Sequence, residues 1–241
     1  MRPRSSGQQR ILAMLAGLPL SPAASDYLGQ RGLLEVATGL RFGAVPDSPA
    51  PRLRPYAGRL VIPSIGPRDN VYDVAFRCIR DHDCKAAECP KYLFLPGVEK
   101  RLYNLRAVAE ATDTIHITEG QLDAATLEAC GLRAVGVAGA NGWKTHHRRL
   151  FQGFDRVCVW GDGDSAGRDF ALRVSHDVAG ADVMMVESQY DINSLYVEQG
   201  RDAVLSIAEG EDSDDHNDDA EWGLAEPDGD DWPHDSERPP Y

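Results

Sequence analysis

Residues 155–170 read DRVCVWGDGDSAGRDF, and this stretch decides the fold. Residues 155–160 are mostly apolar, as expected of a strand that is covered on both faces of its sheet. Residues 165–178 have the apolar spacing of a helix. A glycine-rich turn that contains Asp162 and Asp164 joins the two. A buried strand that leads directly into a helix predicts one repeat of a parallel α/β sheet.

The same alternation of strand and helix continues on both sides of this stretch. Further strands are predicted at 114–118, 133–138 and 182–186, and further helices at 121–130, 145–151 and 192–199. Short loops join these elements, so we expect a parallel sheet with flanking helices over residues 109–208. Ligands of such sheets bind beyond the carboxyl ends of the strands.

The preceding half of the chain has a less regular pattern. Residues 7–18 and 21–30 predict helices, whereas residues 40–106 mix proline, glycine and arginine with short β-like runs. We therefore expect a smaller α+β unit with hairpins over residues 1–108. After Ala208 the apolar pattern ends, so residues 209–241 are expected to form a disordered acidic tail.

The net charge of −13 belongs to the end of the chain. Residues 209–241 hold 14 acids and one base, whereas residues 1–208 hold 24 of each. Within that neutral part, residues 1–108 carry +7 and residues 109–208 carry −7. The acidic total therefore does not exclude a nucleic-acid enzyme, although phosphate binding depends on lysine and arginine.

The cysteine content and the hydropathy pattern bear on the compartment. Five cysteines are an odd number for a secreted disulfide scaffold and fit reduced thiols. No apolar run approaches the length of a transmembrane helix. We therefore expect a cytoplasmic protein that has no membrane partner, and the host cytoplasm if the gene belongs to a phage.

Acidic side chains recur at the predicted strand ends. Glu119 follows the first strand, Asp162 and Asp164 follow the third, and Asp191 comes after the fourth. Clustered carboxylates repel one another unless a cation lies between them, and oxygen ligands suit Mg²⁺ or Mn²⁺. Each acid alone has a simpler interpretation as a turn residue or a helix cap. Their ordered recurrence favours a metal site.

This pattern resembles the Toprim domain, the catalytic domain shared by DnaG-type primases, topoisomerases and some nucleases and recombination proteins. The matching segments are ITEGQLD at 117–123, VWGDGDSAGRD at 159–169 and DIN at 191–193. The resemblance implies a Rossmann-like parallel sheet. Further segments at 27–33, 58–63, 75–77, 90–93 and 102–105 look like those that precede Toprim in the RNA-polymerase core of DnaG-type primases.

The resemblance also implies roles for individual residues. The divalent metals, Mg²⁺ or Mn²⁺, would be held by Glu119, Asp162, Asp164 and Asp191, with support from Asp123 and Asn193. Nucleotide phosphates or the template would contact Arg59, Arg77, Lys91 and Lys100.

The function that the resemblance implies is that of a DNA primase catalytic core. Such a core joins ribonucleoside triphosphates into short RNA primers on a single-stranded DNA template. A zinc ribbon and a helicase domain are not recognisable, so the expected partners are a replicative helicase, a separate zinc-ribbon protein, or both. Two alternatives stay open: a Toprim nuclease or recombination protein, and a non-catalytic replisome adaptor.

Four further side chains suggest a second metal. Cys78, His82, Cys84 and Cys89 lie within twelve residues and offer the sulfur and nitrogen ligands that zinc prefers. Their spacing lacks the paired Cys-x-x-Cys motifs of zinc knuckles. We therefore interpret them as reduced thiols and a histidine in a loop, with a zinc site as the alternative.

The acidic tail allows three hypotheses. It can act as a solubilising end, dock a replication partner through Trp232 and Tyr241, or fold back on the basic half and compete with DNA. The solubilising role is the default for a charge run of this kind.

Overall fold

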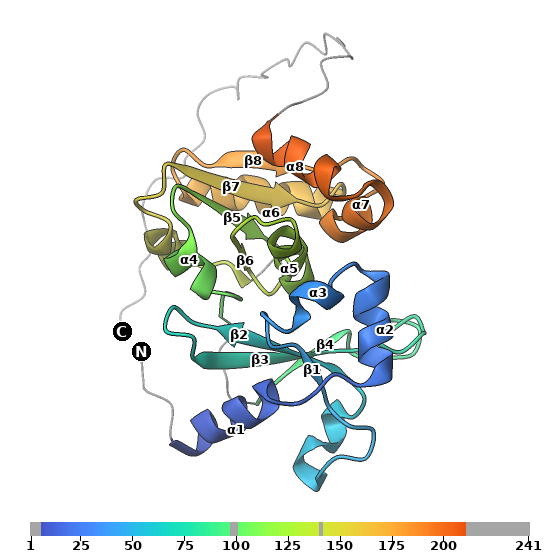
Figure 1. Ribbon diagram of the computed structural model, residues 1–241. Coiled ribbons are helices and arrows are strands. Elements are labelled where there is room, and N and C mark those ends of the chain that lie inside the picture. The colour runs from blue at the N-terminus through green and yellow to red at the C-terminus, as the bar shows by residue number, and fades with distance from the viewer. Residues whose placement is uncertain (1–5, 97–100, 140–141, 211–241) are drawn as a thin grey trace, which may run out of the picture. The chain divides into compact units, whose positions relative to one another are not determined.

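The computed structural model describes residues 6–96, 101–139 and 142–210 (Figure 1). Lys100 and the acidic tail, including Trp232 and Tyr241, lie outside the described residues. Among the described helices, none is long and apolar enough to cross a membrane.

The first half of the chain forms an antiparallel sheet. Its strands are β1 (Gly43–Ala44), β2 (Leu60–Ile65), β3 (Val71–Arg77) and β4 (Tyr92–Phe94), hydrogen-bonded in that order. Helix α1 (Ser6–Ala16) buries Leu12 and Leu15 against the Val61, Val74 and Phe76 side of this sheet. Helices α2 (Pro22–Gln30) and α3 (Leu34–Ala37) pack into the core on the opposite side of the sheet. The predicted hairpin-containing α+β unit is thus present.

The second half contains the predicted parallel sheet. Its strands are β5 (Thr114–Thr118), β6 (Ala134–Gly136), β7 (Arg156–Gly161) and β8 (Asp182–Met185), in the order β6-β5-β7-β8. All three pairings are parallel. The helices of this half are α4 (Arg106–Glu110), α5 (Gln121–Ala129), α6 (Ser165–Asp177), α7 (Ile192–Gln199) and α8 (Arg201–Glu209).

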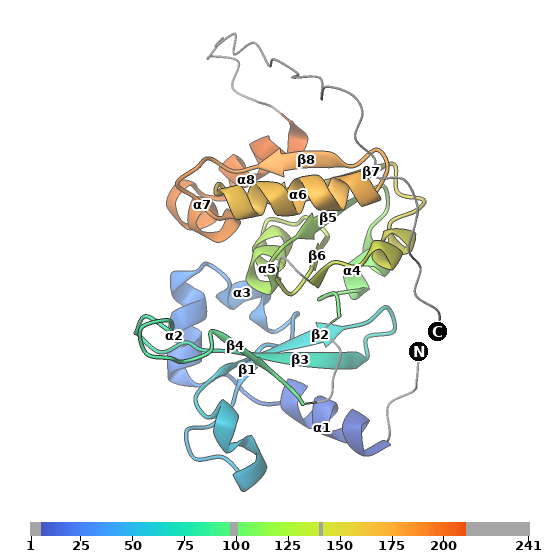
Figure 2. The same ribbon diagram turned by 180° about the vertical axis from the view of Figure 1, so that it is seen from behind.

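Side chains of the central strands alternate between two apolar clusters, because successive residues of a strand point to opposite faces. Ile115, Ile117, Val157 and Val159 pack with α6, which lies over one face of the sheet (Figure 2). Cys158 and Trp160 belong to the cluster that holds α5, α7 and α8. Both faces are therefore covered, which explains the continuous apolar character of β7.

One hydrophobic cluster joins the two halves. Leu60 and Ile62 of β2, Leu28 of α2, and Leu122 and Leu127 of α5 are members of the same cluster and are all less than 5% exposed. A common core fixes the antiparallel sheet against the start of α5. This matters for function, because α5 begins two residues after Glu119.

Several elements differ from the sequence prediction, among them the short helices α3 and α4 and a 3₁₀ helix at Pro51–Tyr56, which were not predicted. Residues 145–150 form a 3₁₀ helix, with i→i+3 hydrogen bonds such as His147 N to Lys144 O, in place of the expected helix over 145–151. Helix α8 was not among the predicted elements, although five of its nine residues are apolar and its charged residues lie only at its two ends. Val204 and Ala208 of α8 nevertheless pack into the shared core.

A buried histidine makes the stability of this sheet depend on pH. The indole Nε1 of Trp160 donates to Nδ1 of His116 over 3.0 Å, and His116 is 3% exposed. Burial, helped by the positive charge of Arg156, lowers the pKa of His116 to about 4. The unfolded chain therefore takes up this proton first, and the stability due to the neutral imidazole is lost as pH falls from 6.5 to 4.

We predict that the free energy of unfolding of the wild type falls more steeply over this pH range than that of His116→Gln. The glutamine retains an acceptor for Trp160 but does not titrate, and the difference amounts to about 3 kcal/mol. Urea unfolding between pH 4 and 7.5 measures it. Parallel curves for the two proteins would contradict the prediction.

Candidate active site

Four acidic side chains converge on one cavity of about 360 Å³. They are Glu119, Asp123, Asp162 and Asp191, and Arg31, Arg77 and Lys91 line the same cavity. Glu119 follows β5 directly, Asp162 follows β7 directly, and Asp191 caps α7 after β8. The cavity thus lies at the carboxyl end of the parallel sheet, where the sequence predicted a ligand site.

The turn after β7 is shaped by close backbone contacts. A Cβ atom on Gly167 would lie 2.4 Å from the backbone nitrogen of Asp162, and one on Gly163 would lie 2.0 Å from the carbonyl oxygen of Glu187. Only glycine fits at both places. The start of α6 therefore packs directly on the backbone of Asp162 and holds its carboxylate at the edge of the cavity.

Two of the predicted metal ligands also act as helix caps. Oδ1 of Asp164 accepts a hydrogen bond from the backbone of Gly167 over 2.7 Å, and Oδ1 of Asp191 accepts one from Ser194 over 2.6 Å. Each cap engages Oδ1, so Oδ2 can still coordinate a cation. Asp164 is exposed and does not line the cavity, whereas Asp191 does.

The crowding of the acids changes their proton affinity. Burial, together with the charges of Asp123, Asp191, Glu119 and Asp164, raises the pKa of Asp162 to about 7. Burial and the neighbouring acids likewise raise the pKa of Asp123 to about 6, although Arg77 and Arg31 oppose the shift. Burial is the largest cause of both pKa shifts and repulsion between the carboxylates adds to it, and a bound cation would oppose both effects. The donor set is all oxygen and fits Mg²⁺ or Mn²⁺.

A pair of tyrosines fixes the cationic side of the cavity. Nε of Arg77 donates to the hydroxyl of Tyr27, and its Nη1 donates to that of Tyr92 over 2.6 Å. The guanidinium carbon lies 5.0 Å from the ring centre of Tyr92 and 5.7 Å from that of Tyr27. Arg31 lies 4.9 Å from the Tyr27 ring. The aromatic rings thus hold both guanidinium groups facing the acids.

Sequence reasoning did not identify Arg31. Two hydrogen bonds with Asn193 hold Arg31 near the acids. Oδ1 of Asn193 accepts from Nη1 of Arg31 over 2.7 Å, and Nδ2 of Asn193 donates to the carbonyl oxygen of Arg31 over 3.0 Å. Nδ2 also donates to the hydroxyl of Thr126 over 3.0 Å. Segment 27–33, which resembles a primase segment, holds both Tyr27 and Arg31 and is the signal in the sequence that points to Arg31.

Two expected site residues lie elsewhere in the structure. Asn193, expected to support the metals, is buried in the contacts with Arg31 and Thr126 and does not line the cavity. Arg59, expected to contact phosphates, is also buried and donates to Pro90 O and Cys89 Sγ. Arg77 and Lys91 do line the cavity, whereas Lys100 lies outside the described residues.

The structure also gathers the cysteine-histidine group. One potential ligand atom from each of Cys78, His82, Cys84 and Cys89 lies within 4.8 Å of the others. In the part of the chain that is described, none of the five cysteines forms a disulfide.

Relatives of the sequence include a phage protein and bacterial DNA primases. The Gene 57 protein of Mycobacterium phage D29 is 41% identical over 152 residues, which cover 62% of this chain and 97% of that protein. The DNA primase of Neisseria meningitidis serogroup A is 29% identical over 191 residues, which cover 65% of this chain. The match spans about a third (31%) of the length of that primase. No family model matches the chain.

The fold is that of DnaG catalytic cores. The structure of a DnaG primase catalytic domain bound to single-stranded DNA superposes with a TM-score of 0.65 and 21% sequence identity. The match covers 86% of this chain and 83% of that domain. It includes both the antiparallel and the parallel sheet, because neither half alone makes up that share of the chain.

The contact between Gly167 and Asp162 leads to a prediction. We expect Gly167→Ala to lower the free energy of unfolding by about 1–3 kcal/mol, because the new methyl group must displace backbone. It also weakens Mn²⁺ binding, since the carboxylate of Asp162 moves with that backbone. Urea unfolding and electron paramagnetic resonance of Mn²⁺ measure the two effects.

Gly29→Ala is the matched control. Gly29 lies within α2, and a Cβ atom there has nothing within 4 Å. Alanine at this site stabilises the helix by up to about 1 kcal/mol and leaves Mn²⁺ binding unchanged. Equal behaviour of the two variants would show that the close contact at Gly167 does not position Asp162.

Proposed function

The chain belongs to the family of the phage D29 Gene 57 protein, and from this premise and its DnaG-like fold we propose that it is a DNA primase catalytic core. The proposed reaction joins ribonucleoside triphosphates into short RNA primers on single-stranded DNA. The 3′-hydroxyl of one nucleotide attacks the α-phosphate of the next, and pyrophosphate leaves.

One observation carries the proposal: carboxylates and fixed cations face each other across the same cavity. The carboxylates would bind divalent metal ions, and the arginine and lysine side chains would bind phosphate. A site that is acidic on one side and basic on the other is suited to a metal-bound nucleoside triphosphate, whose phosphates need both kinds of partner. A cluster of acids without basic residues would be equally suited to a metal ion that carries no nucleotide.

The acids have the role of holding two or more Mg²⁺ or Mn²⁺ ions. We assign this role to Glu119, Asp162, Asp164 and Asp191, and Asp123 would support them from within the cavity. When bound, such ions activate the attacking hydroxyl and stabilise charge on the phosphoryl oxygens. Because Asp164 and Asp191 are held as helix caps, their carboxylates are oriented before any ligand arrives.

The basic residues have the role of placing phosphate. Arg77 is held by two hydroxyls and two rings, so its remaining N–H groups have a fixed direction toward the cavity. Such a guanidinium can bind a phosphate with little loss of side-chain entropy. Arg31 and Lys91 extend the positive charge along the cavity. In a structural relative the catalytic domain is bound to single-stranded DNA, and we infer that the template follows this basic side.

Further parts of the proposal concern partners and location. A replicative helicase, a zinc-ribbon protein, or both, would deliver the template, and the reaction would take place in the cytoplasm of the phage host. The chain is proposed to comprise a basic unit over 1–108, a catalytic unit over 109–208 and an acidic tail over 209–241.

Loss of an acid in the cavity tests the reaction. We expect Asp162→Asn to reduce primer synthesis by on the order of 100-fold or more, because the metal loses a charged ligand. The assay contains single-stranded DNA, Mn²⁺ and labelled ribonucleotides, and short RNA products are resolved on a gel. Asp113→Asn is the control, because Asp113 is exposed and lies just before β5, at the other end of the sheet.

The same assay separates the alternatives. Shortened template in place of RNA products would identify a nuclease. No product of either kind, even with helicase and zinc-ribbon proteins added, would identify a non-catalytic adaptor. Full synthesis by Asp162→Asn would refute the assignment of the site.

The basic side makes a separate prediction about DNA affinity. We expect Lys91→Ala to weaken binding of single-stranded DNA and to lower the slope of log affinity against log salt by about 0.7, the value for one phosphate contact on a single strand. Arg10→Ala is the control, because Arg10 is exposed on α1, which covers the opposite face of the antiparallel sheet. Fluorescence anisotropy at several salt concentrations measures both, and equal slopes for the two variants would contradict the role of Lys91.

A further inference from the structure

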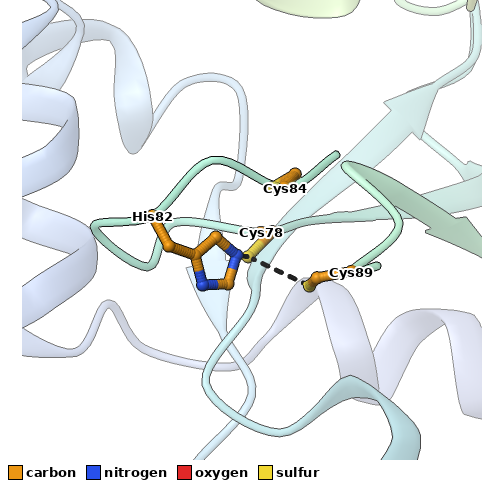
Figure 3. Close-up of side chains that lie close together, drawn as sticks. All are labelled: Cys78, His82, Cys84 and Cys89. Carbon is orange, nitrogen blue, oxygen red and sulfur yellow. Dashed lines mark hydrogen bonds between the residues drawn. The ribbon is translucent and has the colours of Figure 1, made fainter. Parts of the chain in front are cut away.

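A loop at the edge of the cavity gathers three thiols and an imidazole. It connects β3 to β4 and contains Cys78, His82, Cys84 and Cys89 (Figure 3). The four side chains come together inside the loop, with the ring of His82 directed toward the sulfur of Cys78. Sequence spacing alone did not favour this arrangement, because the group contains no Cys-x-x-Cys pair.

The distances within this group match those around a tetrahedral zinc ion. Zinc lies about 2.3 Å from sulfur and about 2.0–2.1 Å from nitrogen, so ligand atoms in a tetrahedron are separated by about 3.8 Å for S···S and about 3.6 Å for S···N. The Sγ atoms of Cys78 and Cys89 are 3.7 Å apart, and Sγ of Cys78 is 3.5 Å from Nε2 of His82. No pair of ligand atoms in the group is more than 4.8 Å apart, which is within about 1 Å of the tetrahedral separations.

We propose that Cys78, His82, Cys84 and Cys89 bind one structural zinc ion. Three thiolates and one imidazole are soft and borderline donors, which favour zinc over the Mg²⁺ or Mn²⁺ suited to the carboxylates. Four protein ligands fill the coordination sphere and leave no position for substrate, which is the property of a structural site. The site does not depend on the proposed primase activity.

Arg59 supplies the charge that such a site requires. Zinc with three thiolates and a neutral imidazole carries a net charge of −1. Arg59 is 7% exposed, and its Nη2 donates to Sγ of Cys89 over 3.3 Å while Nη1 donates to Pro90 O over 2.8 Å. A buried guanidinium bound to a ligand sulfur both neutralises the complex and orients the ligand. This accounts for the burial of Arg59 away from the nucleotide cavity.

The loop has little else to hold it together. Its residues from Arg80 to Pro90 are exposed or half-buried, and they form only turns. Backbone bonds such as Cys89 N to Cys84 O, at 2.8 Å, close the turn but bury no apolar surface. A metal can take the place of a hydrophobic core in such a segment.

The position of the loop links it to the cavity. The backbone of Cys78 donates to Lys91 O over 2.9 Å, so the first ligand is tied to a residue that lines the acidic cavity. Arg80 and Lys85, together with Arg31, Arg77 and Lys91, line an adjoining pocket with the four proposed ligands. Asp83 lines the same pocket, so an ordered loop places both basic and acidic side chains beside the cavity.

A disulfide between Cys78 and Cys89 is the main competing explanation. The observed 3.7 Å between their sulfur atoms is far from the roughly 2.05 Å of an S–S bond. A disulfide would also leave His82 and Cys84 without a role.

Metal analysis of the full chain, without a polyhistidine tag and without chelators, tests the proposal. We expect about one zinc per chain by mass spectrometry, and below about 0.1 in the double variant His82→Ala, Cys84→Ser. His176→Ala and Cys130→Ala, which lie outside the loop, should each retain the zinc. So should the double variant Asp162→Asn, Asp164→Asn, which separates this site from the carboxylates.

Two further measurements keep the result independent of folding defects. Replacement of zinc by Co²⁺ should produce the visible and thiolate charge-transfer bands of a tetrahedral sulfur site, absent in His82→Ala, Cys84→Ser. Circular dichroism should show that this variant keeps its sheets, while trypsin cleaves it faster after Arg80 and Lys85. The proposal is overturned by less than about 0.1 zinc per chain with no uptake of Co²⁺ after reduction, by zinc retained in the loop variant, or by a Cys78–Cys89 disulfide in the native protein.

Discussion

The burial of several carboxylates side by side at the carboxyl end of the parallel sheet is the constraint on which the rest of the site depends. Burial first, and then the charges of neighbouring acids, raise the pKa values of Asp162 and Asp123, although Arg77 and Arg31 oppose the shift at Asp123. Close packing of α6 on the turn after β7 prevents Asp162 from retreating into solvent. The protein therefore holds an unfavourable arrangement of charge ready for a cation.

The antiparallel half contributes the opposite charge through its packing. The cluster shared by β2, α2 and α5 fixes the relative positions of the two sheets, so Arg77 at the end of β3 faces residues that come from the parallel sheet. Tyr27 and Tyr92 then orient its guanidinium. The hydrophobic cluster shared by the two halves thus places the basic residues of the antiparallel half opposite the acids of the parallel half.

The predictable part of this protein was the part that depends on local pattern. The parallel sheet followed from alternating strands and helices, and the convergence of Glu119 and Asp162 followed because parallel strands end at one edge. Arg31 was not predicted, since its position depends on a contact with the distant Asn193. The gathering of Cys78 and Cys84 was not favoured either, because an irregular loop without helix or strand brings them together. Long-range hydrogen bonds and irregular turns leave little periodic signal in a sequence.

The hydrogen bonds of Asn193 have a mechanical consequence. Asn193 forms hydrogen bonds with both the side chain and the backbone of Arg31, and it lies in the first turn of α7, the helix that Asp191 caps. Asn193 therefore connects a basic residue of the cavity, Arg31, to the helix turn that carries an acidic one, Asp191. Because both hydrogen bonds run to the side chain of Asn193, Arg31 and the first turn of α7 are held together as one unit. The basic and the acidic sides of the cavity therefore share one anchor, Asn193, which is itself buried outside the cavity lining.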